Sequence, residues 1–148
     1  QSSLRIISGY YGLLRPFDQI LPYRLEMGTK LENNKGKNLY KFWGDKITDI
    51  LNSDLDSKDV VVNLASEEYF KSINKHKINS KIITPVFKEF KNDSYKVIAI
   101  YAKKARGLMS RFLIERQSHN SDDIKLFNVG GYSYDSNLSS ENEFIFTR

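Results

Sequence analysis

The chain has 148 residues, of which 40% are hydrophobic and 28% are charged, and its 23 Lys and Arg residues outnumber its 18 Asp and Glu residues to give a net charge of +5. A chain of this length can bury roughly 68–70% of its unfolded surface, so it needs no disulfide or metal to hold a core. The absence of Cys excludes thiol nucleophiles, disulfide scaffolds, Cys-ligated zinc and iron–sulfur clusters. His76 and His119 are too far apart in sequence to indicate a metal site.

The chain also lacks the patterns of membrane insertion and secretion. No apolar run approaches the roughly 20 residues that a transmembrane helix needs. The N-terminal residues lack the charged, apolar and small-residue order of a signal peptide. We therefore expect a cytoplasmic protein with no membrane partner.

The first third of the chain predicts a strand, a loop and a helix. Residues 4–8 (LRIIS) are typical of a buried strand, and the aperiodic residues 9–30 favour an ordered loop. The polar residues 32–37 favour a surface turn. Asn38 is a suitable N-cap for a helix whose apolar face recurs at the 3.6-residue period. That face comprises Leu39, Tyr40, Trp43, Ile47, Ile50 and Leu51.

The middle third predicts a strand, a short helix and a hairpin. Residues 60–64 (VVVNL) are β-branched, and Ser66 followed by two glutamates predicts a helix that reaches residue 73. Residues 81–90 and 95–101 predict two strands joined by a KNDS turn. Pro85 favours an edge position or a bulge in the first of them.

The last third predicts a helix over residues 102–117, a short helix from Ser121, and closing strands over residues 132–135 and 144–147. No internal repeat and no long linker interrupts the chain. The sequence therefore predicts one domain over residues 1–148, of mixed α/β (α+β) class, in which helices flank a mixed β-sheet.

The net charge is concentrated in one segment. Residues 95–117 contain six basic residues and one acidic residue, Glu115, whereas the rest of the chain is balanced. In a helix, the face opposite the apolar residues carries Lys103, Lys104, Gly107, Ser110 and Arg111, with Arg106 on its flank. This asymmetry favours an anionic partner, and a solvated helix face explains it equally well.

Gly107 stands among these basic residues although glycine costs about 1 kcal/mol relative to alanine inside a helix. Its missing side chain lets either a neighbouring element or a phosphate approach closely. Both explanations stay open at this point.

Three strand ends carry polar or basic residues. Arg15 follows the strand at residues 4–8, Ser66 follows residues 60–64, and Lys104 follows residues 95–101. Ligands collect beyond the carboxyl ends of parallel strands in sheets flanked by helices. If these three strands are parallel, we expect the three junctions to line one cleft.

The loop over residues 15–28 is dense in arginine, tyrosine and carboxylates. One interpretation is a salt-bridge network that fixes the loop. The other has Arg15 and Arg24 contacting a phosphate or carboxylate while tyrosines such as Tyr11 and Tyr23 stack on a base. Asp18 and Glu26 lack the spacing of a catalytic carboxylate pair. The sequence also lacks a Walker loop and the GxGxxG, GxSxG and HExxH motifs.

Five strings of the sequence resemble the bacterial YaaA family of peroxide-stress proteins, in the family's order. They are SGYYGLLRPFD (8–18), PYRLEMG (22–28), LYKFWG (39–44), NLASEEYF (63–70) and YAKKARGLMSR (101–111). The resemblance implies a cytoplasmic protein with a mixed α/β fold that protects against hydrogen peroxide, limits free iron and binds DNA through a positively charged cleft. The basic residues within the matching strings are Arg15, Arg24, Lys103, Lys104, Arg106 and Arg111.

The resemblance supplies no catalytic residue, metal ligand or cofactor. Family members open with a further N-terminal region, including a helix-hairpin-helix element, that has no counterpart here. The chain therefore resembles the C-terminal part of a family member. If the further region covers a sheet face, we expect this chain to expose an apolar patch or to self-associate.

Three functions follow as hypotheses. The first is a DNA-binding, stress-protective protein that contacts phosphates without reading sequence. The alternative is an enzyme acting on a small anionic or nucleotide-like substrate, with Tyr23, Glu26 or Ser66 transferring protons. Direct iron sequestration has the least support, because without Cys only oxygen ligands and two isolated histidines remain.

Overall fold

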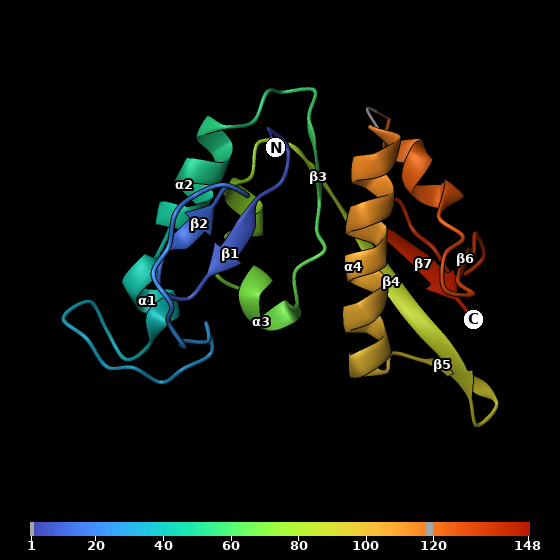
Figure 1. The fold of residues 1–148 in the computed structure, drawn as a ribbon, viewed down its shortest axis with the longest axis horizontal. Helices are drawn as coiled ribbons and strands as arrows, with labels where there is room; N and C mark the ends of the chain where they lie inside the picture. The colour runs from blue at the N-terminus through green and yellow to red at the C-terminus, as the bar shows by residue number, and fades with distance from the viewer. Residues whose placement is uncertain (1, 118–119) are drawn as a thin grey trace. The chain divides into compact units, whose positions relative to one another are not determined.

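The computed structural model describes residues 2–117 and 120–148, and its backbone contacts divide the chain into two compact units (Figure 1). Unit 1 comprises Gln1–Asp59 and Ala65–Ser80, and unit 2 comprises Val60–Leu64 and Lys81–Arg148. His119 lies outside the described residues. The expectation of a single domain over residues 1–148 stays a prediction.

Unit 1 combines a two-stranded antiparallel sheet with short helices. Strand β1 (Ile6–Ser8) pairs with β2 (Gly12–Leu14), which lies in the segment predicted to be an irregular loop. The hairpin forms because Gly12 adopts a φ of +80°, and the Ser8 hydroxyl accepts hydrogen bonds from the Tyr10 and Tyr11 amides. The helices are α1 (Leu39–Trp43), α2 (Lys46–Ser53), α3 (Glu67–Phe70) and the 3₁₀ helix η1 (Lys75–Lys77).

The helix predicted from Asn38 is two helices rather than one. The Asn38 N-cap is confirmed, since its side chain accepts a hydrogen bond from the Lys41 amide at 3.0 Å. Gly44 then ends α1 with a φ of +52°, a left-handed conformation that favours glycine, and α2 begins two residues later. The apolar period survives the break, because Leu39, Ile47 and Leu51 are all buried.

Unit 2 contains a five-stranded mixed sheet. Its strands are β3 (Val60–Val62), β4 (Lys81–Lys91), β5 (Ser94–Lys96), β6 (Ser133–Tyr134) and β7 (Glu143–Thr147). The order is β3-β4-β7-β6, with β5 paired to the end of β4. β3 and β7 run parallel to β4, whereas β5 is antiparallel to β4 and β6 is antiparallel to β7. The predicted mixed sheet is therefore confirmed.

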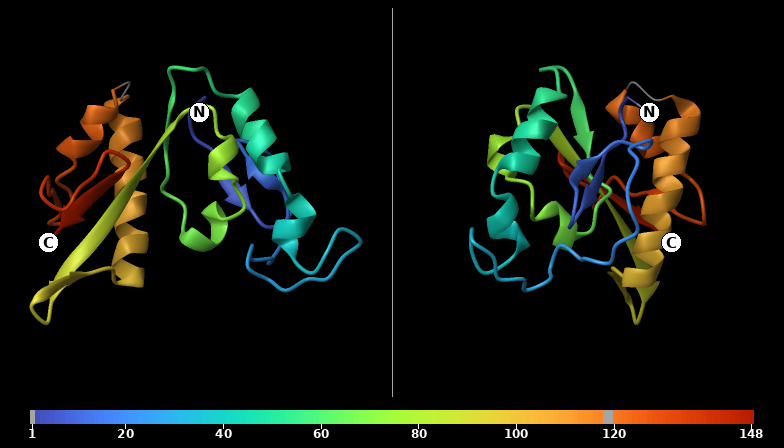
Figure 2. Two further views of the ribbon diagram at one scale, coloured as in Figure 1. Left: turned by 180° about the vertical axis from the view of Figure 1, so that it is seen from behind. Right: turned by 60° about the vertical axis from the view of Figure 1, so that its left-hand side comes forward.

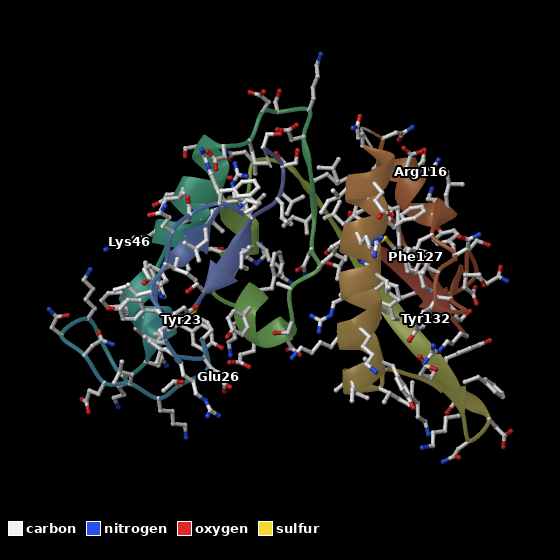
Figure 3. All side chains as sticks on the ribbon, viewed as in Figure 1. Tyr23, Glu26, Lys46, Arg116, Phe127 and Tyr132 are labelled. Atoms are coloured by element: carbon white, nitrogen blue, oxygen red, sulfur yellow. The ribbon has the colours of Figure 1, made fainter. Side chains whose placement is uncertain are left out.

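Two helical segments flank this sheet, as predicted. Helix α4 (Ala99–Arg116) runs alongside β4 in the views of Figures 1 and 2, and the 3₁₀ helix η2 (Ser121–Leu126) follows it. α4 begins three residues earlier than predicted, because Ala99, Ile100 and Tyr101 join the helix instead of extending β5, which ends at Lys96. The core between helices and sheet centres on Phe87, Met109, Phe127, Tyr132 and Phe146; two of these, Phe127 and Tyr132, are labelled in Figure 3.

Pro85 lies in the interior of β4, a central strand, where its missing N–H is tolerated. The amides of Thr84 and Phe90 donate toward β7, so Pro85 faces the opposite edge of β4. There, β3 pairs with β4 only as far as Ile83. Pro85 therefore lies beyond the part of β4 that pairs with β3, which is a local edge of the sheet. β4 as a whole is not an edge strand, because it has neighbours on both sides.

Neither a membrane-spanning helix nor a metal-binding cluster is found among the described residues. No helix in residues 2–117 or 120–148 is both long and apolar enough to cross a membrane. No group of three or more His, Asp or Glu side chains in these same ranges is arranged to hold a metal ion.

Candidate nucleic-acid interface

The outer face of α4 in unit 2 presents two lysines and a glycine. Lys103 and Lys104 are exposed, and within the described residues neither ammonium group forms an ion pair. A methyl group built on Gly107 would meet no described atom within 4 Å. Close packing among the described residues of unit 2 therefore does not explain this glycine, and within that unit the helix surface beside the lysines is open.

Gly107→Ala should raise the free energy of unfolding by about 0.5–1 kcal/mol, because alanine has the higher helix propensity and there is space for its methyl group. If a phosphate approaches the backbone here, the same change should weaken DNA binding. Urea unfolding and a DNA titration of the one variant measure both effects. Loss of stability would show that something unseen packs on Gly107, and unchanged DNA affinity would remove the glycine from the interface.

The three arginines of α4 are engaged by other groups, and the third of them, Arg116, lies over the Phe112 ring. Arg106 is half-buried, and its guanidinium donates to the Ala102 carbonyl at 3.3 Å and to the Leu64 carbonyl at 3.4 Å. Burial lowers the pKa of Arg106 from its ordinary value. Arg111 forms an exposed pair with Glu115 at 2.7 Å. Lys103 and Lys104 are therefore the more available cations on this helix.

In unit 1, Arg15 belongs to a network that fixes the loop. Its Nη2 lies 2.9 Å from Asp54 Oδ1, and Arg5 donates to the other oxygen of the same carboxylate. Its backbone amide donates to Asp18 Oδ2 at 2.7 Å. The hydrogen bond from Arg5 and the charges of both arginines lower the pKa of Asp54. These contacts match the salt-bridge interpretation of the loop.

A pocket of about 460 Å³ lies beside this network. It is lined by Ser2, Arg5, Arg15, Pro16, Phe17 and Asp18. This volume falls within the range of small-molecule sites. The charges of Arg5 and Arg15 are offset by Asp54 and Asp18, so the pocket has little net attraction for an anion.

The loop tyrosines pack against one another. The rings of Tyr10, Tyr11 and Tyr23 have centroid separations of 4.9–5.5 Å. The Tyr11 hydroxyl accepts the Leu21 amide at 2.9 Å, and the Tyr23 and Ser8 hydroxyls are 2.5 Å apart. Tyr11 and Tyr23 therefore help to order the loop, and Tyr23 still exposes 40% of its surface.

The remaining predicted residues of unit 1 have mixed roles. Arg24 and Glu26 are exposed in the loop, where Figure 3 labels Glu26. The Ser66 hydroxyl caps α3 by accepting from the Tyr69 amide. Glu68 reaches the loop by accepting from the Gly28 amide at 2.7 Å. The hydroxyl of Ser66 is thus used as the N-cap of α3.

The predicted cleft of three parallel strand ends is wrong. β1 pairs antiparallel with β2 in a sheet of its own, and β5 is antiparallel to β4, the parallel neighbour of β3. Two local turns cause the difference. Gly12 reverses the chain after β1, and Asn92 and Asp93, with φ values of 52° and 56°, form a tight hairpin turn before β5.

Two residues of the unit 1 network were not predicted from the sequence. Asp54 lies 39 residues from Arg15 and 49 from Arg5, and Glu68 lies 40 residues from Gly28. No spacing pattern in the sequence predicts contacts between residues so far apart in the chain. Only the resemblance of NLASEEYF (63–70) to a family string marked Glu68 as belonging to a recurrent segment.

Comparison with known proteins supplies the family. Residues 1–138 match a family model described as peroxide stress protein YaaA. A UPF0246 protein of Shewanella oneidensis is 56% identical over 150 residues, and one of Idiomarina loihiensis is 54% identical. Each alignment covers 100% of this chain and 58% of the relative, so the chain spans little more than half the length of these relatives. As the resemblance predicted, the chain belongs to the peroxide stress protein YaaA family.

Proposed function

We propose that this chain contributes to the peroxide stress response by binding DNA through phosphate contacts that do not depend on sequence. The observation that carries the proposal is the outer face of α4, where exposed Lys103 and Lys104 adjoin the open surface at Gly107. Ammonium groups without a protein carboxylate can neutralise phosphates and release their counterions. Lysine acts as a point charge and does not require one orientation of a base.

The position of the lysines on α4 adds to this attraction. Both lie in the first two turns of an 18-residue helix, and its N-cap residue Ile98 provides no side-chain hydrogen bond. The amides of the first turn carry a partial positive charge that acts in the same direction as the lysines. In unit 1, the exposed Arg24 is a further phosphate contact in this proposal, whereas Arg15 shares Asp54 with Arg5.

In the same proposal, phosphate binding limits iron-mediated damage. Divalent iron associates with the anionic DNA backbone, and a protein that neutralises phosphates releases condensed cations. In this proposal the chain displaces iron from DNA, where peroxide would otherwise generate radicals beside the bases. The mechanism needs no iron ligands on the protein.

The alternative is an enzyme that uses the pocket beside Arg5 and Arg15 in unit 1. The volume of about 460 Å³ suits a small substrate. However, the two arginine charges are offset by Asp54, and Ser66 is used as a helix cap. Tyr23 is hydrogen-bonded to Ser8. These contacts favour the DNA-binding proposal over the enzyme.

The test is a double variant, Lys103→Ala with Lys104→Ala, titrated with a fluorescent DNA duplex. Removing two phosphate contacts should weaken binding about tenfold or more at low salt. The matched control is Lys37→Ala with Lys58→Ala, which removes the same charge from two exposed lysines in unit 1. Equal losses in both double variants would mean that net charge, and not the α4 face, governs binding.

A further inference from the structure

The β4–β5 hairpin of unit 2 displays an aromatic pair on its surface. Phe90 and Tyr95 are direct cross-strand partners, with ring centroids 5.2 Å apart at 65°. Their exposed fractions are 59% and 43%. The hairpin projects beyond the end of β7 (Figure 2). The two aromatic rings thus lie side by side and are not part of the hydrophobic core of unit 2.

The backbone fixes the position of this pair. The loop between the strands is two residues long, and Asn92 and Asp93 both have the positive φ of a type I′ turn. The register places Phe90 opposite Tyr95 and Lys91 opposite Ser94. The binding of a ligand that stacks on these rings therefore costs little conformational entropy, because the rings are already ordered.

Three lysines of the hairpin lie near the aromatic pair in sequence, one of them on the same face. Lys88 precedes Phe90 by two residues and so shares its face of the strand, whereas Lys91 and Lys96 lie on the other face. Within the described residues none of the three ammonium groups forms an ion pair. The neighbouring Glu89 does not neutralise them, because it is buried and bound by Tyr132 and Arg148. Asp93 in the turn is the one exposed acidic residue between residues 88 and 96.

We propose that the hairpin is a binding site for unpaired nucleobases, in which Phe90 and Tyr95 stack on bases, Lys88 on the same face contacts a flanking phosphate, and Lys91 and Lys96 add positive charge from the other face of the hairpin. Aromatic rings bordered by cations are the elements of single-strand recognition. A duplex hides its base faces within the stack and offers the rings no partner. The proposal rests on the nucleic-acid function proposed above and adds a preference for single-stranded segments.

The experiment compares a labelled 15-nucleotide thymidine oligomer with a duplex of equal length. Phe90→Ala with Tyr95→Ala should lower affinity for the single strand at least about tenfold and change duplex affinity less than about twofold. The matched control is Leu126→Ala at the end of η2, which belongs neither to α4 nor to the hairpin and whose exposed fraction of 54% is close to that of Phe90. In Phe90→Trp, which keeps a stacking ring, affinity should persist and the new tryptophan fluorescence should be quenched on binding.

The failures of the two proposals are distinguishable. Single-strand affinity unchanged by the aromatic double variant overturns the hairpin site, even if the lysines of α4 prove essential for duplex binding. Equal loss of single-strand and duplex affinity overturns the preference for unpaired bases. If the aromatic variant converts a dimer to a monomer without altering single-strand affinity, the pair is instead a contact between copies of the chain, and the proposal is wrong.

Discussion

Phe87→Ala is expected to lower the free energy of unfolding of unit 2 by about 3–5 kcal/mol. Phe87 exposes 2% of its surface and contacts the rings of Phe127, Tyr132 and Phe146 at centroid distances of 5.2–5.7 Å. Truncation removes these contacts and leaves a cavity that the surrounding β-sheet can fill only in part. A loss of this size is comparable with the whole stability of many domains.

The matched control for Phe87→Ala is Phe90→Ala, three residues along the same strand. The side chain removed is identical, but Phe90 is largely exposed. We expect this variant to cost less than about 1 kcal/mol. Urea unfolding followed by circular dichroism compares the two. Similar losses in both variants would mean that Phe90 is covered in the folded protein, which would also contradict the hairpin site.

Glu89→Gln is expected to destabilise unit 2 by about 2–3 kcal/mol. The Glu89 carboxylate accepts hydrogen bonds from the Tyr132 hydroxyl and from Arg148 Nε, the latter at 2.8 Å. Arg148 in turn donates to the Gly130 carbonyl and lies over the rings of Tyr101 and Tyr132. The amide keeps the volume but removes the charge that holds Arg148, so the end of β7 should loosen. Hydrogen exchange of the β7 amides should accelerate in this variant.

The same cluster predicts a pH dependence with two limbs. Burial alone would raise the pKa of Glu89, but the hydrogen bonds from Arg148 and Tyr132 outweigh it and lower the pKa below 4.5. The stability from this group is present above pH 4.5 and is lost as the pH falls through the folded-state pKa. Burial and the Glu89 carboxylate raise the pKa of Tyr132 from 10.0 to about 12. Its contribution is present below pH 10 and is lost between pH 10 and about 12.

Unfolding curves across this pH range test both limbs. Glu89→Gln should reduce the acid-side loss, and Tyr132→Phe should reduce the alkaline loss. Tyr10→Phe removes an exposed hydroxyl in unit 1 and serves as the control. An alkaline limb of the same size in Tyr132→Phe as in the unaltered chain would show that the buried tyrosine is not its source.

Local sequence pattern was sufficient for the elements that have a strong period. The strand predicted over residues 81–90 is found as β4, and the predicted apolar face of α4 is confirmed at Ala105 and Met109. Leu108, predicted on the same face, is exposed. The hydrophobic pattern did not predict the structure at positions where a single glycine changes the direction of the chain. Gly12 creates the β1–β2 hairpin and Gly44 divides the predicted helix, and neither choice is visible in the hydrophobic period.

The residues of the candidate sites also differ in how far the sequence predicted them. Lys103 and Lys104 could be predicted because helical spacing places them opposite the buried residues Ala105 and Met109. The ion pair between Arg15 and Asp54 could not be predicted, because it joins two segments that are far apart in the sequence.

The central claim is that the α4 lysines neutralise DNA phosphates. Its most direct test is the affinity for a duplex measured across about 50 to 200 mM salt, in the unaltered chain and in the Lys103→Ala, Lys104→Ala variant. We predict a steep linear fall of log K with log salt concentration, and a slope that is shallower by about two units in the variant. An identical slope in both proteins would contradict the claim.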